Sequence, residues 1–124
     1  MFAPRSAFSG FSVDNLDAAR HFYANTLGLT VEDGPAGLTL KLPGGDTSVF
    51  AYPKGAQHIP ATFTILNFAV DDIDEAVAEL TRRGVHFERY GGLDQDDQGI
   101  SRGSGPLIAW FKDPAGNILS VLED

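Results

Sequence analysis

Two similar stretches of nine residues occur in this chain, and this repeat limits the folds that the chain can adopt. Residues 11–19 read FSVDNLDAA and residues 68–76 read FAVDDIDEA, 57 positions later. Each copy runs into a helical pattern that ends near a glycine, Gly28 or Gly84, and then into a strand-like segment that ends in glutamate. Self-similarity at a fixed spacing indicates a duplicated structural unit. The chain is therefore expected to contain two copies of one unit.

Each copy shows the same succession of patterns. Alternating apolar residues indicate strands and apolar residues three or four apart indicate a helix. The expected strands of the first copy are 7–13, 29–32, 38–42 and 47–52, and those of the second are 61–70, 85–90, 107–111 and 118–122. One helix follows the first strand of each copy. This order predicts an α+β fold of two βαβββ modules that form a curved eight-stranded cleft.

Short polar residues mark where each helix begins. Asp14 or Asn15 precedes the first helix and Asp71 or Asp72 precedes the second, and such side chains accept hydrogen bonds from the free N–H groups of a first helical turn. The chain is expected to be a single domain, 1–124, with module one at about 7–56 and module two at about 61–124.

Composition narrows the possible partners and location. There is no cysteine, which excludes disulfides and thiolate metal sites, and the net charge of −8 disfavours nucleic acid and anionic membranes. Residues 1–6 lack the pattern of a signal peptide, and no apolar run is long enough to span a bilayer. We therefore expect a cytoplasmic protein without nucleic acid or membrane partners.

Three motifs carry a resemblance to a known family. They are Val-Asp-x-[Leu/Ile]-Asp-x-Ala at 13–19 and 70–76, Phe-Tyr at 22–23 followed by Leu-Gly-Leu at 27–29, and AWFKDPAGNI at 109–118. Together they make the chain resemble the vicinal-oxygen-chelate superfamily of glyoxalases, extradiol dioxygenases and bleomycin-resistance proteins. The resemblance implies the two-module fold with a concave cleft, but it leaves the activity open, since this scaffold carries several chemistries.

The resemblance also implies four positions for a divalent cation. In this sequence they fall on Phe8, Phe50, Ile65 and Ser120. A divalent cation needs converging imidazole or carboxylate groups, and none of the four residues supplies one. We therefore expect no metal site at these positions and no cofactor, with a mostly apolar and aromatic cleft instead.

The expected ligand-binding residues follow from these positions, because strand residues two apart share a face. Tyr52 and Trp110 are expected either to stack on a planar ligand or simply to pack, and Asn67 either to orient a ligand or to bond to backbone. The full set is Phe8, Phe50, Tyr52, Phe63, Ile65, Asn67, Trp110 and Ser120, with Gly10, Ser12, Ser48, Ile118 and Leu122 on the same strand faces.

Few residues suggest acid–base chemistry. His58 lies in the loop 54–60 and is the one histidine considered as a catalytic candidate, against a structural or surface role. The glycine-rich segment 91–105, with its polar run 94–98, reads as a long loop that is either a solvated surface loop or a lid over the cleft. In the second case Arg102 would contact an anion.

Three functional hypotheses follow. The first is a metal-free protein that binds a small organic ligand in a sequestering or antibiotic-resistance-like role. The second is a glyoxalase-like lyase or isomerase, or a dioxygenase, whose site has been relocated to His58 or to an acidic residue of 94–97. The third is a structural or partner-binding domain whose cleft is filled by its own side chains. In each case the resemblance implies a homodimer, since exposed strand edges need cover.

Overall fold

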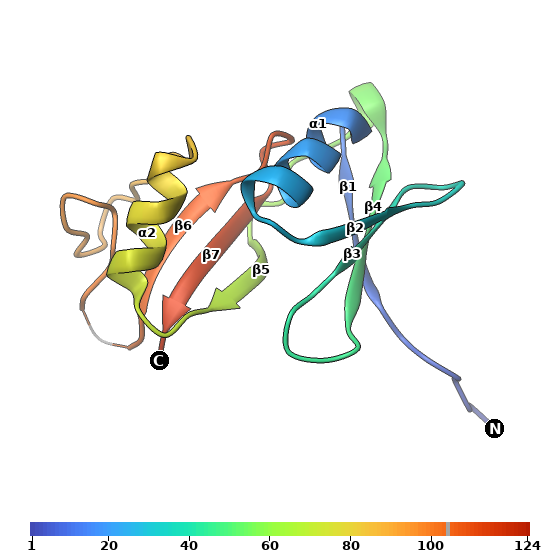
Figure 1. Ribbon diagram of the computed structural model, residues 1–124, viewed down its shortest axis with the longest axis horizontal. Helices are drawn as coiled ribbons and strands as arrows, with labels where there is room; N and C mark the ends of the chain where they lie inside the picture. The colour runs from blue at the N-terminus through green and yellow to red at the C-terminus, as the bar shows by residue number, and fades with distance from the viewer. Residues whose placement is uncertain (104) are drawn as a thin grey trace. The chain divides into compact units, whose positions relative to one another are not determined.

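The chain forms two compact units in the computed structural model, which describes residues 1–103 and 105–124. The first unit is Met1–Ile59 and the second is Pro60–Asp124, so each contains one copy of the repeat (Figure 1). The described residues hold seven strands and two α-helices, which confirms the α+β class and the arrangement of two modules.

The sheet of the first unit contains four strands in the order β1-β4-β3-β2. The strands are β1 Ser9–Val13, β2 Thr30–Asp33, β3 Leu38–Lys41 and β4 Ser48–Pro53, with β1 parallel to β4 and the other pairs antiparallel. Alternate residues face opposite sides of such a sheet. One face carries Val13, Leu38, Leu40, Val49 and Ala51, all buried. This face is the core of the unit.

A helix covers that core face. The α-helix α1, Leu16–His21, continues into a wider π-helical turn η1, Phe22–Thr26, and Gly28 follows in the left-handed conformation that ends helices (φ 76°). Of the two expected caps, Asn15 is the one observed, accepting a hydrogen bond from the Ala18 N–H at 2.9 Å. Tyr23 is fully buried and its ring contacts Phe11 of the sheet at a centroid distance of 5.8 Å.

The sheet of the second unit contains three strands in the order β5-β7-β6. They are β5 Thr64–Ala69, β6 Leu107–Lys112 and β7 Ile118–Glu123, with β5 parallel to β7 and β6 antiparallel to it. The pairing of β5 with β7 shifts between Thr64 and Leu66, which leaves Ile65 as an extra residue in a β-bulge. A buried turn joins β6 to β7, where the Asp113 carboxylate accepts from the N–H groups of Ala115 and Asn117.

The helix α2, Ile73–Arg82, packs on one face of this sheet (Figure 1). Ile73 and Val77 are buried against the core of the unit, which includes Phe111 and Leu119. Asp72 is the observed N-cap and accepts from the Glu75 N–H at 3.1 Å. Glu123, near the C-terminus, accepts from the Ile73 N–H at 2.9 Å, so a negative charge also lies at the positive end of the helix dipole.

The expected strand 85–90 is the one element that does not form as a regular strand. It contacts β6 through one bridge, Phe87 with Phe111, and one hydrogen bond from the Glu88 N–H to the Trp110 carbonyl at 2.7 Å. The neighbouring segment 95–101 competes for the same edge, because Ser101 bridges Ile108. The eight-stranded expectation is therefore corrected to seven strands in the described residues. Of the loop 91–105, Ser104 lies outside those residues.

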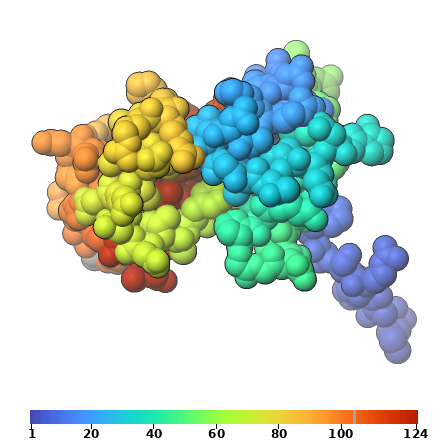
Figure 2. All heavy atoms as spheres, viewed as in Figure 1, coloured from blue at the N-terminus to red at the C-terminus, as the bar shows by residue number. Residues whose placement is uncertain are grey.

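The N-terminal residues extend from the rest of the first unit, in blue in Figure 2. Residues 1–7 are exposed, and Met1 and Phe2 make up the most exposed apolar surface there. None of the helices in the described ranges is both long and apolar enough to cross a membrane.

The assignment of sheet faces can be tested with neighbouring residues of β3. Leu40→Ala removes a fully buried side chain and is expected to lower the free energy of unfolding by about 2–5 kcal/mol. Thr39→Ala, on the opposite face, is expected to lower it by less than about 1 kcal/mol. Urea denaturation of both variants measures the difference, and equal losses would contradict the face assignment.

Candidate functional site

Three aromatic side chains follow one another on the face of the first sheet that points away from α1. We call Phe8, Phe50 and Tyr52 the aromatic row. Phe50 and Tyr52 alternate along β4 and are stacked at a centroid distance of 6.2 Å, and Phe8, just before β1, meets Phe50 edge-on at 6.4 Å. Phe8 is 70% exposed and Tyr52 37% exposed. The row therefore offers apolar ring surface that its own unit leaves uncovered.

Two glycines make room for the rings of the row. Gly10 pairs with Phe50 across β1 and β4, so no side chain stands there beside the ring. A Cβ atom on Gly37 would lie 3.0 Å from the Phe50 ring and 2.3 Å from the carbonyl oxygen of Ala51. A side chain at position 37 would displace Phe50, so glycine is required at this close approach.

A serine–histidine pair adjoins the row. Ser12 pairs with Tyr52 across the sheet, and its Oγ lies 2.7 Å from Nδ1 of His58, which follows the short 3₁₀ turn η2, Gly55–Gln57. Both residues are half-buried. This distance is that of a hydrogen bond, so the imidazole contacts the hydroxyl of the residue that pairs with Tyr52.

In the second unit, three predicted site residues lie side by side across the sheet. Asn67 pairs with Ser120, and Ser120 pairs with Trp110, so the three form one row over β5, β7 and β6 on the face opposite α2. We call this the cross-strand row. Ser120 is fully buried and its Oγ–H donates to Oδ1 of Asn67 at 2.6 Å, while Asn67 itself is exposed and Trp110 half-buried.

The remaining two predicted residues lie apart from this row. Ile65 occupies the bulge of β5, so the expected alternation from Phe63 through Ile65 to Asn67 is interrupted there. Thr64, rather than Ile65, pairs with Ile118. Phe63 precedes β5 and is 67% exposed. The bulge is a property of strand pairing, which residue alternation does not reveal.

Tyr90 is a further residue near the cross-strand row. Its ring meets Trp110 edge-on at 5.6 Å, and its buried hydroxyl has no hydrogen-bond partner, the one such side-chain atom within 1–103 and 105–124. Burial, and to a smaller extent the negative charge of Glu88, raises the pKa of this hydroxyl.

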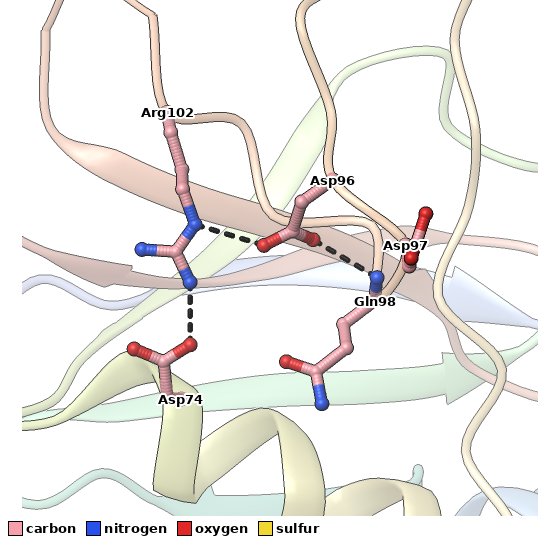
Figure 3. A pocket seen from close by; sticks show the side chains of 5 residues that line it. All are labelled: Asp74, Asp96, Asp97, Gln98 and Arg102. Carbon is pink, nitrogen blue, oxygen red and sulfur yellow. Dashed lines mark hydrogen bonds and ion pairs between the residues drawn. The ribbon is translucent and has the colours of Figure 1, made fainter.

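The loop after Tyr90 and the start of α2 line an open pocket of about 530 Å³. Its lining is Asp74, Asp96, Asp97, Gln98 and Arg102 (Figure 3). The Arg102 guanidinium lies between two carboxylates, donating to Asp74 and, at 2.8 Å, to Asp96. The predicted anion contact, Arg102, is thus held by two carboxylates.

The same contacts fix Asp96. Burial raises the pKa of its carboxyl, but hydrogen bonds from Arg102 and the Ile100 N–H outweigh that effect and leave the pKa below its ordinary value. Asp96 therefore stays ionised as part of the tether between the loop and α2. Proton transfer near neutral pH requires a pKa closer to 7, so this carboxylate is poorly suited to act as a general base.

Among the residues that the structure describes, the side chains that could coordinate a metal ion do not cluster. Nowhere in the described part of the chain do three His, Asp or Glu side chains converge as potential ligands of one ion. At the four positions implied by the family, the one polar group is the Ser120 hydroxyl, and it donates to Asn67. This set of donors does not fit a divalent cation.

Sequence reasoning did not identify the contacts that join distant segments. Ser12 and His58 are 46 residues apart, and Asp74 and Arg102 are 28 apart. Each residue was visible in the sequence, but no local pattern links the partners. The polar run 94–98 is the sequence pattern that coincides with the pocket of Figure 3.

Comparison with known proteins assigns the family of this chain. The chain contains two α+β modules, each with one helix and three or four strands, and each leaves one sheet face uncovered by its own helix. The model for the Glyoxalase/Bleomycin resistance protein/Dioxygenase superfamily matches residues 7–121, and the chain belongs to this superfamily. A comparison with curated proteins gives no match.

Solved structures agree with this assignment. TnmS3, an antibiotic binding protein from Streptomyces sp. CB03234, is 26% identical over 98% of both chains, with a TM-score of 0.68. A superfamily member from Sphaerobacter thermophilus DSM 20745 is also 26% identical, covering 96% of this chain and 98% of its own, with a TM-score of 0.67. A lactoylglutathione lyase from Agrobacterium tumefaciens, at 22% identity, 97% and 94% coverage and a TM-score of 0.67, shares the fold.

Proposed function

We propose that this protein binds a small, planar, partly aromatic organic molecule in the cytoplasm without a metal ion, in a sequestering or antibiotic-resistance-like role. The observation that carries the proposal is the aromatic row, where three neighbouring rings stand on a sheet face that α1 does not cover. Ring surface of this kind binds planar apolar molecules through stacking and removal of apolar area from water.

Two further observations support the proposal. The four positions that the resemblance implies for metal ligands favour apolar contact over metal coordination, since they hold Phe8, Phe50, Ile65 and Ser120. TnmS3, an antibiotic binding protein, is 26% identical to this chain, and this similarity supports a binding role. The residues that the proposal assigns to ligand binding are the aromatic row in the first unit and, in the second unit, the cross-strand row together with Phe63 and Ile65.

The contribution of the aromatic row can be measured with 2-ethylnaphthalene as a planar apolar probe. Phe50→Ala removes the ring that contacts both neighbours and is expected to weaken binding about three- to tenfold in isothermal titration calorimetry. Phe2→Ala, on the exposed N-terminal segment, is the matched control and is expected to leave the affinity unchanged. Equal affinities of the wild-type and Phe50→Ala proteins would remove the row from the site.

Metal content and oligomeric state can be read from one spectrum. We propose a homodimer, because β1 and β2 in one sheet and β5 in the other are edge strands. Native mass spectrometry of protein purified without chelator or metal resin is expected to show a dimer that carries no divalent ion. A functional divalent site retains its ion through purification, so a mass with one metal per chain would contradict the metal-free proposal.

A second candidate function is a glyoxalase-like isomerase, and the Ser12–His58 pair favours it. The pair places an imidazole, the side chain that most often serves as a general acid or base, against the hydroxyl of Ser12, which is the cross-strand neighbour of Tyr52. Under this proposal His58 is the general acid–base that transfers the proton of a C–H group next to a carbonyl.

The test of this candidate is turnover of the hemithioacetal of methylglyoxal and glutathione. His58→Gln is expected to lower kcat/KM about 10²- to 10⁴-fold, and His21→Gln, an exposed histidine of α1, is expected to leave it unchanged. Undetectable turnover by the wild-type protein, or turnover independent of His58, would exclude this candidate.

A further inference from the structure

We propose that Asn67, held in place by Ser120, donates a hydrogen bond to an uncharged carbonyl-type oxygen of the bound molecule. This inference rests on the proposed function and adds the chemical group that the ligand must carry. It concerns the cross-strand row of the second unit, in which Ser120 occupies one of the four positions that the resemblance implies for a metal ligand.

The orientation of the Asn67 amide follows from its contact with Ser120. The Ser120 hydroxyl donates to Oδ1 at 2.6 Å, so the carbonyl end of the amide faces the serine. Because the amide is planar, its NH2 group points away from that contact. Ser120 is fully buried, so water does not compete for its hydroxyl and the amide keeps one orientation.

The NH2 group of Asn67 is a donor without an acceptor among the residues that the structure describes. Among residues 1–103 and 105–124, the Ser120 hydroxyl is the one hydrogen-bond partner of the Asn67 side chain. The side chain is exposed, so the group is accessible to an incoming molecule. An amide NH2 donates and does not accept, so the complementary ligand group is an acceptor oxygen.

Trp110 supplies a ring beside this donor. It lies on the same face as Asn67 with Ser120 between them, and two strand spacings separate their backbones by about 10 Å. The small serine side chain leaves the amide and the indole as the two larger groups of the row. A ligand with a flat ring and a carbonyl substituent at its edge contacts both groups.

The charges nearby favour a neutral oxygen over a carboxylate. Lys112 lies two residues beyond Trp110 on the same strand, and its ammonium is 3.6 Å from the Glu88 carboxylate. This ion pair balances the positive charge that would otherwise attract a carboxylate. The chain as a whole has a net charge of −8, which repels anions. A ketone, aldehyde or ester oxygen accepts the hydrogen bond of the amide without that repulsion.

The test compares two probes that differ only at the oxygen, 2-acetylnaphthalene and 2-ethylnaphthalene. Calorimetric titration of the wild-type protein is expected to show three- to tenfold tighter binding of the acetyl compound, the range for one neutral hydrogen bond. In Asn67→Leu, which keeps the size of the side chain but cannot donate, the two probes are expected to bind equally. Ser120→Ala, which frees the amide to rotate, is expected to reduce the preference in part.

A matched control and a second readout complete the test. Asn25→Leu introduces the same change on the exposed turn η1 and is expected to keep the wild-type preference. In the infrared spectrum, the carbonyl stretch of bound 2-acetylnaphthalene is expected to move to lower frequency in the wild-type protein and to return in Asn67→Leu. This second readout separates hydrogen bonding from a change in packing.

Each result has a distinct meaning. Equal binding of the two probes by the wild-type protein, or an unchanged preference in Asn67→Leu, overturns the inference and leaves the proposed function in place. Failure of the wild-type protein to bind either probe contradicts the proposed function, and with it the inference. A preference lost in Asn67→Leu and kept in Asn25→Leu supports both.

Discussion

The structure depends on the fact that each sheet has one helix and therefore one covered face. Leu38 and Leu40 in the first unit, and Phe111 and Leu119 in the second, bury their side chains beneath α1 or α2. Because strand side chains alternate, the same backbone must present an equal number of residues on the opposite face. On these opposite faces the first unit carries aromatic rings and the second carries an amide, a hydroxyl and an indole, which are the candidate site residues of each unit.

The two uncovered faces differ in chemistry, and the difference bears on function. The first carries the aromatic row next to the Ser12–His58 pair, and the second carries the cross-strand row with an oriented amide donor. The pocket between the loop after Tyr90 and α2 differs from both, because the positive charge of Arg102 is already balanced by Asp74 and Asp96. The proposal therefore assigns ligand binding to the first two, while the contacts of the third join the loop to α2.

Prediction from the sequence succeeded where the signal was local. The capping aspartate or asparagine, the glycine after each helix and the turn 113–117 each act through groups a few residues away, and all are observed. It failed for 85–90 because an alternating segment becomes a strand only if a partner edge is available. The segment 95–101 occupies part of that edge through Ser101 and Ile108.

The sequence by itself determined the duplication, through its repeat, and the α+β class, through the alternation and helical spacing of apolar residues, and its motifs indicated the family. The tertiary structure decided which of those residues meet. The bulge at Ile65 sets which β5 residues oppose β7, and Asn67 meets Ser120 across 53 residues of sequence as a result. Hydrogen bonds between such distant groups depend on strand register and loop path, which are fixed by the packing of the whole unit and not by any local pattern.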